Sequence, residues 1–220
     1  MSLIQRKPRP LNRDIADFRD DRLFIVACDD TYAPKQYFSF FNITRVPVHV
    51  VPTQDNSSVA QYVLGRLLEF EHEEDDELWM LLDTDHCIQG HHITGFIQAI
   101  RDAKQRGVHV AVSKPCFELW LLLHHVDESA VVSLPNAKLA EKALRNVLGE
   151  YNKTHLKETD YSVESVRDAC FRAERLDTTV TSGDIPETNT SRVYQLWKAI
   201  AAKALPSQLP EALKELNNSK

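Results

Sequence analysis

The sequence lacks any long apolar run. None of its segments approaches the roughly 20 consecutive apolar residues that a membrane-spanning helix needs, and the N-terminal segment 1–21 has no apolar core that would direct export. With 220 residues, of which 43% are hydrophobic and 26% charged, the composition instead predicts a soluble globular chain that contacts no membrane. This length fits one ordinary domain, or one core with an appended helical part.

Cysteine is scarce and scattered. The four cysteines form no C-x-x-C pair and are too few for a scaffold held together by disulfides. The sequence therefore predicts free thiols in a reducing cytoplasm. The cysteines are Cys28, Cys87, Cys116 and Cys170.

The chain has fewer basic than acidic residues, with 26 Lys and Arg against 32 Asp and Glu. The formal net charge of −6 argues against a protein that coats nucleic acid through bulk electrostatics, although it does not exclude an enzyme that binds nucleic acid locally. The charge is uneven, because Arg6, Lys7, Arg9 and Arg13 make the first residues basic whereas residues 69–77 are strongly acidic. We expect the acidic run to be a solvated helix end and loop.

Short apolar runs alternate with amphipathic stretches up to about residue 115. Strands that alternate with helices predict an α/β fold with a parallel four-stranded sheet and right-handed crossovers. The expected strands are 22–28, 46–51, 77–83 and 108–113, and the helical stretches between them are 34–41, 56–73 and 93–107.

The pattern changes after residue 115, where helical spacing takes over. This change predicts a helical C-terminal half at 116–220 that packs on an α/β core at 22–115, with residues 1–21 as an arm. A segment rich in Thr, Gly and Pro at 178–190 predicts a loop between two helices. The expected helices of this half are 116–125, 136–151, 162–176 and 191–205.

Acidic residues follow two of the predicted strands. Asp29 and Asp30 end the first strand, and Asp83 and Asp85 end the third. Ligands of open parallel sheets bind beyond the carboxyl ends of the strands. In an extended chain Asp83 and Asp85 point to one side, with Cα atoms roughly 6–7 Å apart. Because clustered carboxylates repel one another unless a cation compensates them, this pattern favours a site for Mg²⁺ or Mn²⁺.

Two other interpretations of these residues stay open. Aspartate is common at the ends of parallel strands simply because it caps the helix that follows. A zinc site is the second alternative, although no closely spaced cysteine pair would anchor it and polar loop residues explain the pattern as well. The zinc candidates are His86, Cys87, His91 and His92.

The segment SKPCFELWLLLHH at 113–125 places a glutamate, Glu118, early in an otherwise apolar helix. A buried carboxylate without a partner is costly. Either the positive end of the helix dipole stabilises Glu118, or this side chain faces the acid cluster as a ligand, a base or an orienting group. The sequence leaves both interpretations open.

Three motifs together resemble the RloB-like family, which belongs to the wider Toprim-like group. They are the strand and helix IVACDDTYAPKQYF at 25–38, the strand end LLDTDH at 81–86, and SKPCFELWLLLHH at 113–125. The third corresponds to a characteristic Asn-Pro-x-Phe-Glu-x-Trp helix and is the most specific. EYNK at 150–153 and ETNTSRVYQLWKAI at 187–200 also look like segments of this family.

The resemblance implies a Toprim-like fold and Mg²⁺-dependent (or Mn²⁺-dependent) phosphodiester chemistry. Asp83 and Asp85 would hold the metal, and Asp29 would act as a ligand or as a general acid or base. Glu118 would be the second catalytic residue. The family has glutamate where Asp29 stands and glycine where Asp30 stands, so this chain departs from the pattern at the first strand.

The resemblance also implies substrate-binding residues and partners. Lys114, which replaces the asparagine of the family motif, and His86 are the expected substrate contacts. RloB-like proteins are associated with phage defence by abortive infection and with an AAA-type ATPase partner. The leading hypothesis is thus a nuclease that acts on DNA or RNA. The alternatives are a non-catalytic, degenerate subunit that binds a partner ATPase or nucleic acid, and a hydrolase of small phosphoesters.

Overall fold

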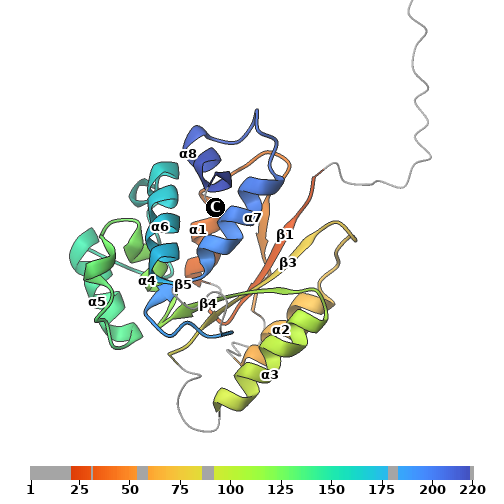
Figure 1. Cartoon of the computed structure of the whole chain (residues 1–220), viewed down its shortest axis with the longest axis horizontal. Helices are drawn as coiled ribbons and strands as arrows, with labels where there is room; N and C mark the ends of the chain where they lie inside the picture. Colours follow the sequence, from red (N-terminus) through yellow and green to blue (C-terminus); the bar gives the residue numbers. More distant parts are fainter. Residues whose placement is uncertain (1–20, 31, 54–58, 86–91, 178–182, 219–220) are drawn as a thin grey trace, which may run out of the picture.

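The computed structural model describes residues 21–30, 32–53, 59–85, 92–177 and 183–218 (Figure 1). Its centre is a five-stranded sheet in the order β2-β1-β3-β4-β5, in which the first four strands of this order are parallel and β5 is antiparallel to β4. The α/β prediction is confirmed. The strands are β1 (Phe24–Cys28), β2 (Val48–Val50), β3 (Glu77–Asp83), β4 (His109–Lys114) and β5 (Thr190–Ser191).

The predicted strand number of four is wrong, because β5 adds a fifth strand. This strand has only two residues, both polar, and lies at the end of the segment that was expected to be a loop. Its pairing with β4 is fixed by tertiary contacts, among them the buried hydrogen bond of 2.8 Å between the hydroxyl groups of Ser113 and Ser191. Such a strand carries no alternating apolar pattern that a sequence could reveal.

Eight α-helices are assigned within the described residues. Their positions agree with the predicted helical stretches, except that the short α8 was not expected. They are α1 (Tyr32–Ser39), α2 (Ala60–Glu69), α3 (His92–Gln105), α4 (Phe117–Leu123), α5 (Ala137–Leu148), α6 (Val163–Leu176), α7 (Val193–Lys203) and α8 (Glu211–Lys214). None of them is long and apolar enough to cross a membrane.

The helices cover both faces of the sheet. Helices α2 and α3 lie against one face, and α1, α4, α6 and α7 lie against the other, with α5 outside α4 (Figure 1). Residues of β1 alternate between the two cores: Phe24 and Val26 belong to the larger one, and Ile25 and Ala27 to the smaller one. A strand buried on both faces needs a continuous apolar run, which is why the sequence revealed this one.

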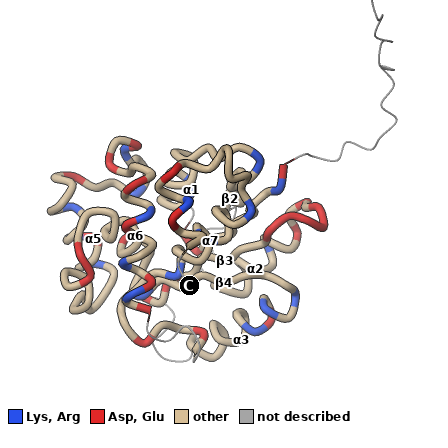
Figure 2. Tube along the Cα trace, turned by 45° about the horizontal axis from the view of Figure 1, so that its top comes forward, with Lys and Arg blue, Asp and Glu red and all other residues tan. Residues whose placement is uncertain are grey.

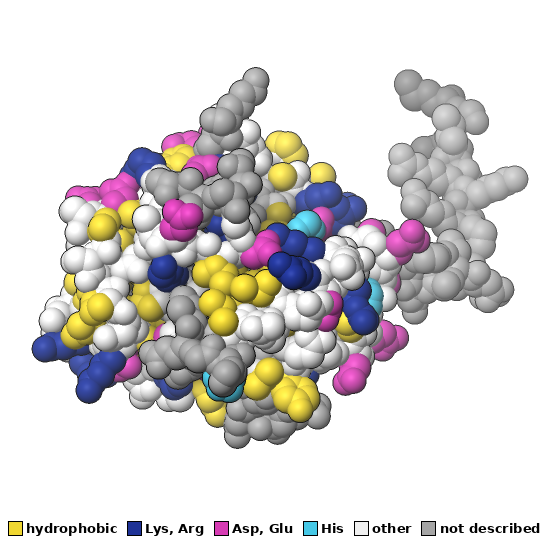
Figure 3. Space-filling view, turned by 60° about the horizontal axis from the view of Figure 1, so that its bottom comes forward, with side chains coloured by type: hydrophobic (Ala, Val, Ile, Leu, Met, Phe, Trp, Pro, Cys, Tyr) yellow, Lys and Arg dark blue, Asp and Glu magenta, His cyan; other side chains and the backbone are white. Residues whose placement is uncertain are grey.

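The acidic run 69–77 lies between α2 and β3, at the amino ends of the strands (Figure 2). One of its acids stabilises the fold, because Asp76 accepts a hydrogen bond of 2.9 Å from the backbone N–H of Leu23, just before β1. The run is therefore at the opposite edge of the sheet from Asp29 and Asp83. On the face shown in Figure 3, hydrophobic side chains form small groups between charged and polar ones.

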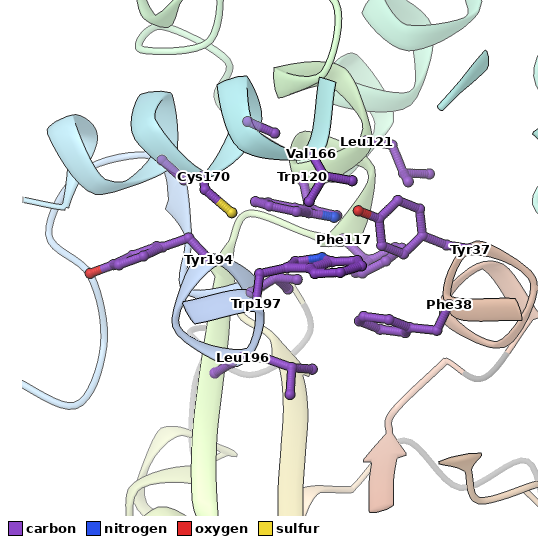
Figure 4. Close-up of a cluster of buried hydrophobic side chains, with 14 of the residues drawn as sticks. Tyr37, Phe38, Phe117, Trp120, Leu121, Val166, Cys170, Tyr194, Leu196 and Trp197 are labelled. Atoms are coloured by element: carbon purple, nitrogen blue, oxygen red, sulfur yellow. The ribbon is translucent and has the colours of Figure 1, made fainter. Parts of the chain in front are cut away.

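Tyr37 of α1 is the hub of an aromatic core between α1, α4 and α7 (Figure 4). Its ring contacts those of Phe117, Trp120 and Trp197 edge to face. Its hydroxyl group lies 3.1 Å from Nε2 of the buried His124, and burial lowers the pKa of that imidazole well below its usual range. Three residues of the segment 113–125 thus build the core, and this packing positions the start of α4.

Candidate functional site

The ends of β1 and β3 bring Asp29 and Asp83 together. The two strands are neighbours, with Cys28 paired to Leu81. Oδ2 of Asp29 accepts a hydrogen bond of 2.8 Å from the backbone N–H of Asp83, and Oδ1 accepts one of 2.9 Å from the N–H of Asp30. The carboxylate of Asp29 therefore ties the two strand ends to each other.

Asp83 in turn contacts the start of α4. Its Oδ2 accepts a hydrogen bond of 3.1 Å from the backbone N–H of Phe117, the first residue of that helix. The strand β4 leads into this helix through Lys114 and Pro115, which are joined by a cis peptide bond. The candidate site therefore lies where β1, β3 and the start of α4 meet, at the carboxyl edge of the sheet.

The chain turns immediately after Asp83, so the extended geometry in which Asp83 and Asp85 would point to one side is not present. The backbone N–H of Thr84 donates to the carbonyl groups of Ser113 (3.0 Å) and Pro115 (3.1 Å), and that of Asp85 donates to Pro115 (3.1 Å). The bonds to Pro115 tie the turn to the β4–α4 connection. Asp85 still lies close enough for its charge to raise the pKa of both Asp29 and Asp83.

Glu118 belongs to the same group of acids. It is the second residue of α4, so the positive end of the helix dipole favours its charge. Its charge also raises the pKa of Asp83. The position of Glu118 in the helix and its electrostatic effect on Asp83 are thus compatible with each other, and a role as ligand, base or orienting group stays a prediction. The hydroxyl group of Tyr151 donates a hydrogen bond of 2.9 Å to Oε1 of Glu118 and fixes the orientation of that carboxylate.

The carboxyl groups of Asp29 and Asp83 are harder to ionise than ordinary ones. Burial is the main cause that raises the pKa of Asp29 from 3.8 to about 6, and the charges of Asp85 and Asp30 add to it. Burial, followed by the charges of Asp29 and Glu118, raises the pKa of Asp83 well above its usual range. A bound cation would offset this repulsion.

Asp30 lies at the outer side of the group and has a partner of opposite charge. The ammonium group of Lys153 is 2.8 Å from its Oδ2. Lys153 and Tyr151 come from the same stretch, EYNK, after α5. Neither residue was expected at the site, although the family-like stretch that contains them was the available signal.

The structure describes one of the two predicted substrate contacts, Lys114. The ammonium group of Lys114 donates a hydrogen bond of 2.7 Å to the backbone carbonyl of Glu187, in the segment before β5. His86 lies outside the described residues. The zinc candidates Cys87 and His91 also lie outside them, and His92 is described. A role for Lys114 and His86 in substrate binding stays a prediction.

The residues of the site suit a hard divalent ion. Their donors are carboxylate oxygens, and proteins commonly bind Mg²⁺ through one or two carboxylates plus waters and substrate phosphates. In the described part of the chain, no group of three or more His, Cys, Asp or Glu side chains is arranged as a metal site. The fit rests on the chemistry of Asp29, Asp83 and Asp85 and on their mutual repulsion.

We expect Asp29 to make folding pH-dependent. Because its pKa rises from 3.8 to about 6 on folding, its contribution to stability is present below about pH 4 and is lost as the pH rises through about 6. Asp29→Asn removes this titration. The free energy of unfolding of the variant, relative to that of the wild type, should increase between these pH values in urea titrations with EDTA. A difference that stays constant across this range would contradict the assignment.

Comparison with known proteins bears on the whole arrangement. A sequence model of the RloB family, described as RloB-like protein, matches residues 24–200, which include β1 to β5 and the acids at their ends. No match was found among curated proteins or among solved structures. The matched region covers most of the chain, and we conclude that the chain belongs to the RloB-like family.

Proposed function

We propose that the chain is a Toprim-type nuclease that uses Mg²⁺ or Mn²⁺ to hydrolyse phosphodiester bonds of nucleic acid. The observation that supports this proposal most is the link between Asp29 and Asp83 at the carboxyl ends of two adjacent strands, within reach of the charges of Asp85 and Glu118. Catalytic groups commonly have perturbed pKa values, which agrees with the raised pKa of both aspartates.

The proposed roles follow from the environment of each carboxylate. Asp83 and Asp85 hold the metal ion, and Asp29 contributes as a ligand or as a general acid or base. When bound, the ion supplies a Lewis acid that activates water and offsets phosphate charge. A pKa of about 6 suits Asp29 for proton transfer near neutral pH. Glu118, held by Tyr151, orients the groups at the start of α4.

The proposed setting comes from the family resemblance. We propose that the chain acts in the cytoplasm in a bacterial phage-defence system of the abortive-infection type, together with an AAA-type ATPase.

A second candidate function is a non-catalytic subunit that binds a partner. The observation that favours it is that several acids already have partners within the chain. Both oxygens of Asp29 accept backbone hydrogen bonds, Asp30 is paired with Lys153, and Glu118 accepts from Tyr151. In this alternative the carboxylates stabilise the junction of β1, β3 and α4.

Metal binding and cleavage assays separate the two functions. The full chain is titrated calorimetrically with Mn²⁺ and Mg²⁺, and labelled single-stranded and duplex DNA and RNA are incubated with it in the presence of each ion or EDTA. We expect binding and cleavage that EDTA abolishes. Asp75→Asn, an exposed aspartate in the acidic loop at the opposite edge, serves as the control and should behave as the wild type. If the wild type neither binds a metal ion nor cleaves nucleic acid, the result favours the non-catalytic subunit.

A further inference from the structure

Two exposed tyrosines lie at the same edge of the sheet as the acids. Tyr32 is the first residue of α1, directly after β1, and Tyr62 is near the start of α2, after β2. In a parallel sheet the helices that follow the strands begin at the carboxyl edge. The side chains are 53% and 61% exposed, and these are the two aromatic members among the strongly exposed large hydrophobic side chains of the described residues.

Tyr32 has a cation beside its ring. The ammonium group of Lys153 lies 5.9 Å from the centre of this ring and 2.8 Å from Oδ2 of Asp30. The backbone N–H of Tyr32 donates a hydrogen bond of 2.9 Å to Oδ1 of Asp30, which fixes the start of α1. An aromatic face and a positive charge thus lie next to each other, beside the candidate site.

Tyr62 lies beside a groove with a second basic residue. The groove has a volume of about 500 Å³ and is lined by Tyr62, Arg66, the acidic Glu69 and other residues at the ends of β2 and α2. The guanidinium group of Arg66 donates a hydrogen bond of 2.8 Å to the backbone carbonyl of Cys28, the residue before Asp29. This contact connects the groove to the end of β1 and therefore to the acids.

We propose that Tyr62, Tyr32 and Lys153 form a binding surface that guides a single nucleic-acid strand across the acidic site. The tyrosines stack unpaired bases, Lys153 binds a phosphate, and Arg66 adds positive charge beside the groove. Surfaces that bind single strands combine aromatic platforms with basic groups in this way. Because the net charge is −6, stacking has to supply binding energy that bulk electrostatics does not. This inference rests on the proposed action on nucleic acid and names its substrate class.

Fluorescence anisotropy of labelled oligonucleotides in EDTA tests the surface without cleavage. We expect the full chain to bind single-stranded DNA or RNA more tightly than the matching duplex. Tyr32→Ala and Tyr62→Ala should each weaken single-strand binding at least about fivefold, whereas Tyr32→Phe and Tyr62→Phe, which keep the ring, should bind as the wild type. Val147→Ala, an exposed residue of α5, is the control for loss of apolar surface.

The salt dependence of binding tests Lys153. If its ammonium group contacts one phosphate, Lys153→Ala should reduce the slope of log K against log salt by about 0.7. Lys138→Ala, which removes an exposed lysine of α5, is the control and should leave the slope unchanged.

The outcomes are decisive for the surface and separable from the nuclease proposal. Equal affinity for single strands and duplex, no binding by the wild type, or an unchanged affinity of either alanine variant would overturn the surface. Tyrosine-dependent binding of single strands without metal-dependent cleavage would support the surface and contradict the nuclease. If the wild type cleaves nucleic acid and both alanine variants cleave it with the wild-type KM, the result would support the nuclease and contradict the surface.

Discussion

Asp83→Asn should abolish most metal-dependent cleavage and, at neutral pH, make the protein more stable. Loss of residues that merely support metal ligands lowers metal affinity or activity by about 10- to 100-fold, so we expect loss of a proposed ligand to lower the cleavage rate by more than about 100-fold. The amide differs from the carboxylate by its charge and by one donor group, and the shape of the side chain is preserved. The effect therefore reports the charge of Asp83.

The expected gain in stability follows from the raised pKa of Asp83. Burial and the charges of Asp29 and Glu118 make the ionised form costly in the folded state. The contribution of this group to stability is thus full below its ordinary pKa, decreases as the pH rises above that value, and is lost as the pH rises through the raised pKa. The neutral amide avoids that cost, and its oxygen can still accept the hydrogen bond from the N–H of Phe117.

Parallel measurements on one preparation check both effects. Cleavage rates are measured with Mg²⁺ and with Mn²⁺, and the free energy of unfolding is measured by urea titration in EDTA. Asp75→Asn is again the matched control, since it removes an exposed charge at the other edge of the sheet. A variant that cleaves at the wild-type rate would remove Asp83 from the metal site. A variant that is less stable at neutral pH would show that the ionised carboxylate stabilises the fold.

The sequence predicted the parts of the site that depend on local patterns. Continuous apolar runs identified β1 and β3 as strands buried on both faces, and the acids that end these runs had to share one edge of a parallel sheet. Asp29 and Asp83 do lie together. The turn at Thr84 has no local signal, because it involves hydrogen bonds to Pro115 in the β4–α4 connection.

The parts that the sequence missed depend on contacts between distant segments. Lys153 reaches Asp30 across 123 positions of the chain, and Tyr151 reaches Glu118 across 33. No periodicity or spacing records such pairs. The strand β5 was missed for the same reason, since its two residues are defined by their partners on β4 and not by their own pattern.

A buried ion pair after α6 provides the second large prediction. The guanidinium group of Arg192 contacts both carboxylate oxygens of Asp177, at 2.8 and 3.2 Å, and these side chains are 7% and 0% exposed. Arg192 also donates to the backbone carbonyls of Gly183 and Asp184, each at 3.0 Å, and Tyr194 donates to Asp177. The pair connects the end of α6 to the residue that follows β5, and the bonds to Gly183 and Asp184 add the segment that leads to β5.

We expect Arg192→Ala to lower the free energy of unfolding by about 3–5 kcal/mol, since it leaves a buried carboxylate without its main partner. Urea unfolding measures the change. Arg145→Ala is the control, because Arg145 and Glu141 form an exposed pair on α5 whose loss should cost less than about 0.5 kcal/mol. Arg192→Met combined with Asp177→Leu, which removes both charges, should lose less stability than the single Arg192→Ala.

The same substitution also tests how β5 is held. The backbone N–H of Arg192 bonds to the carbonyl of Val112 on β4 at 3.0 Å, and substitution of the side chain leaves this bond available. If the ion pair positions β5, amide hydrogen exchange at positions 191 and 192 should be faster in the Arg192→Ala variant than in the wild type. Exchange of the β1 amides should keep its rate relative to global unfolding. Unchanged exchange at β5 together with a loss below about 1 kcal/mol would show that the backbone pairing, and not the buried charges, holds this edge of the sheet.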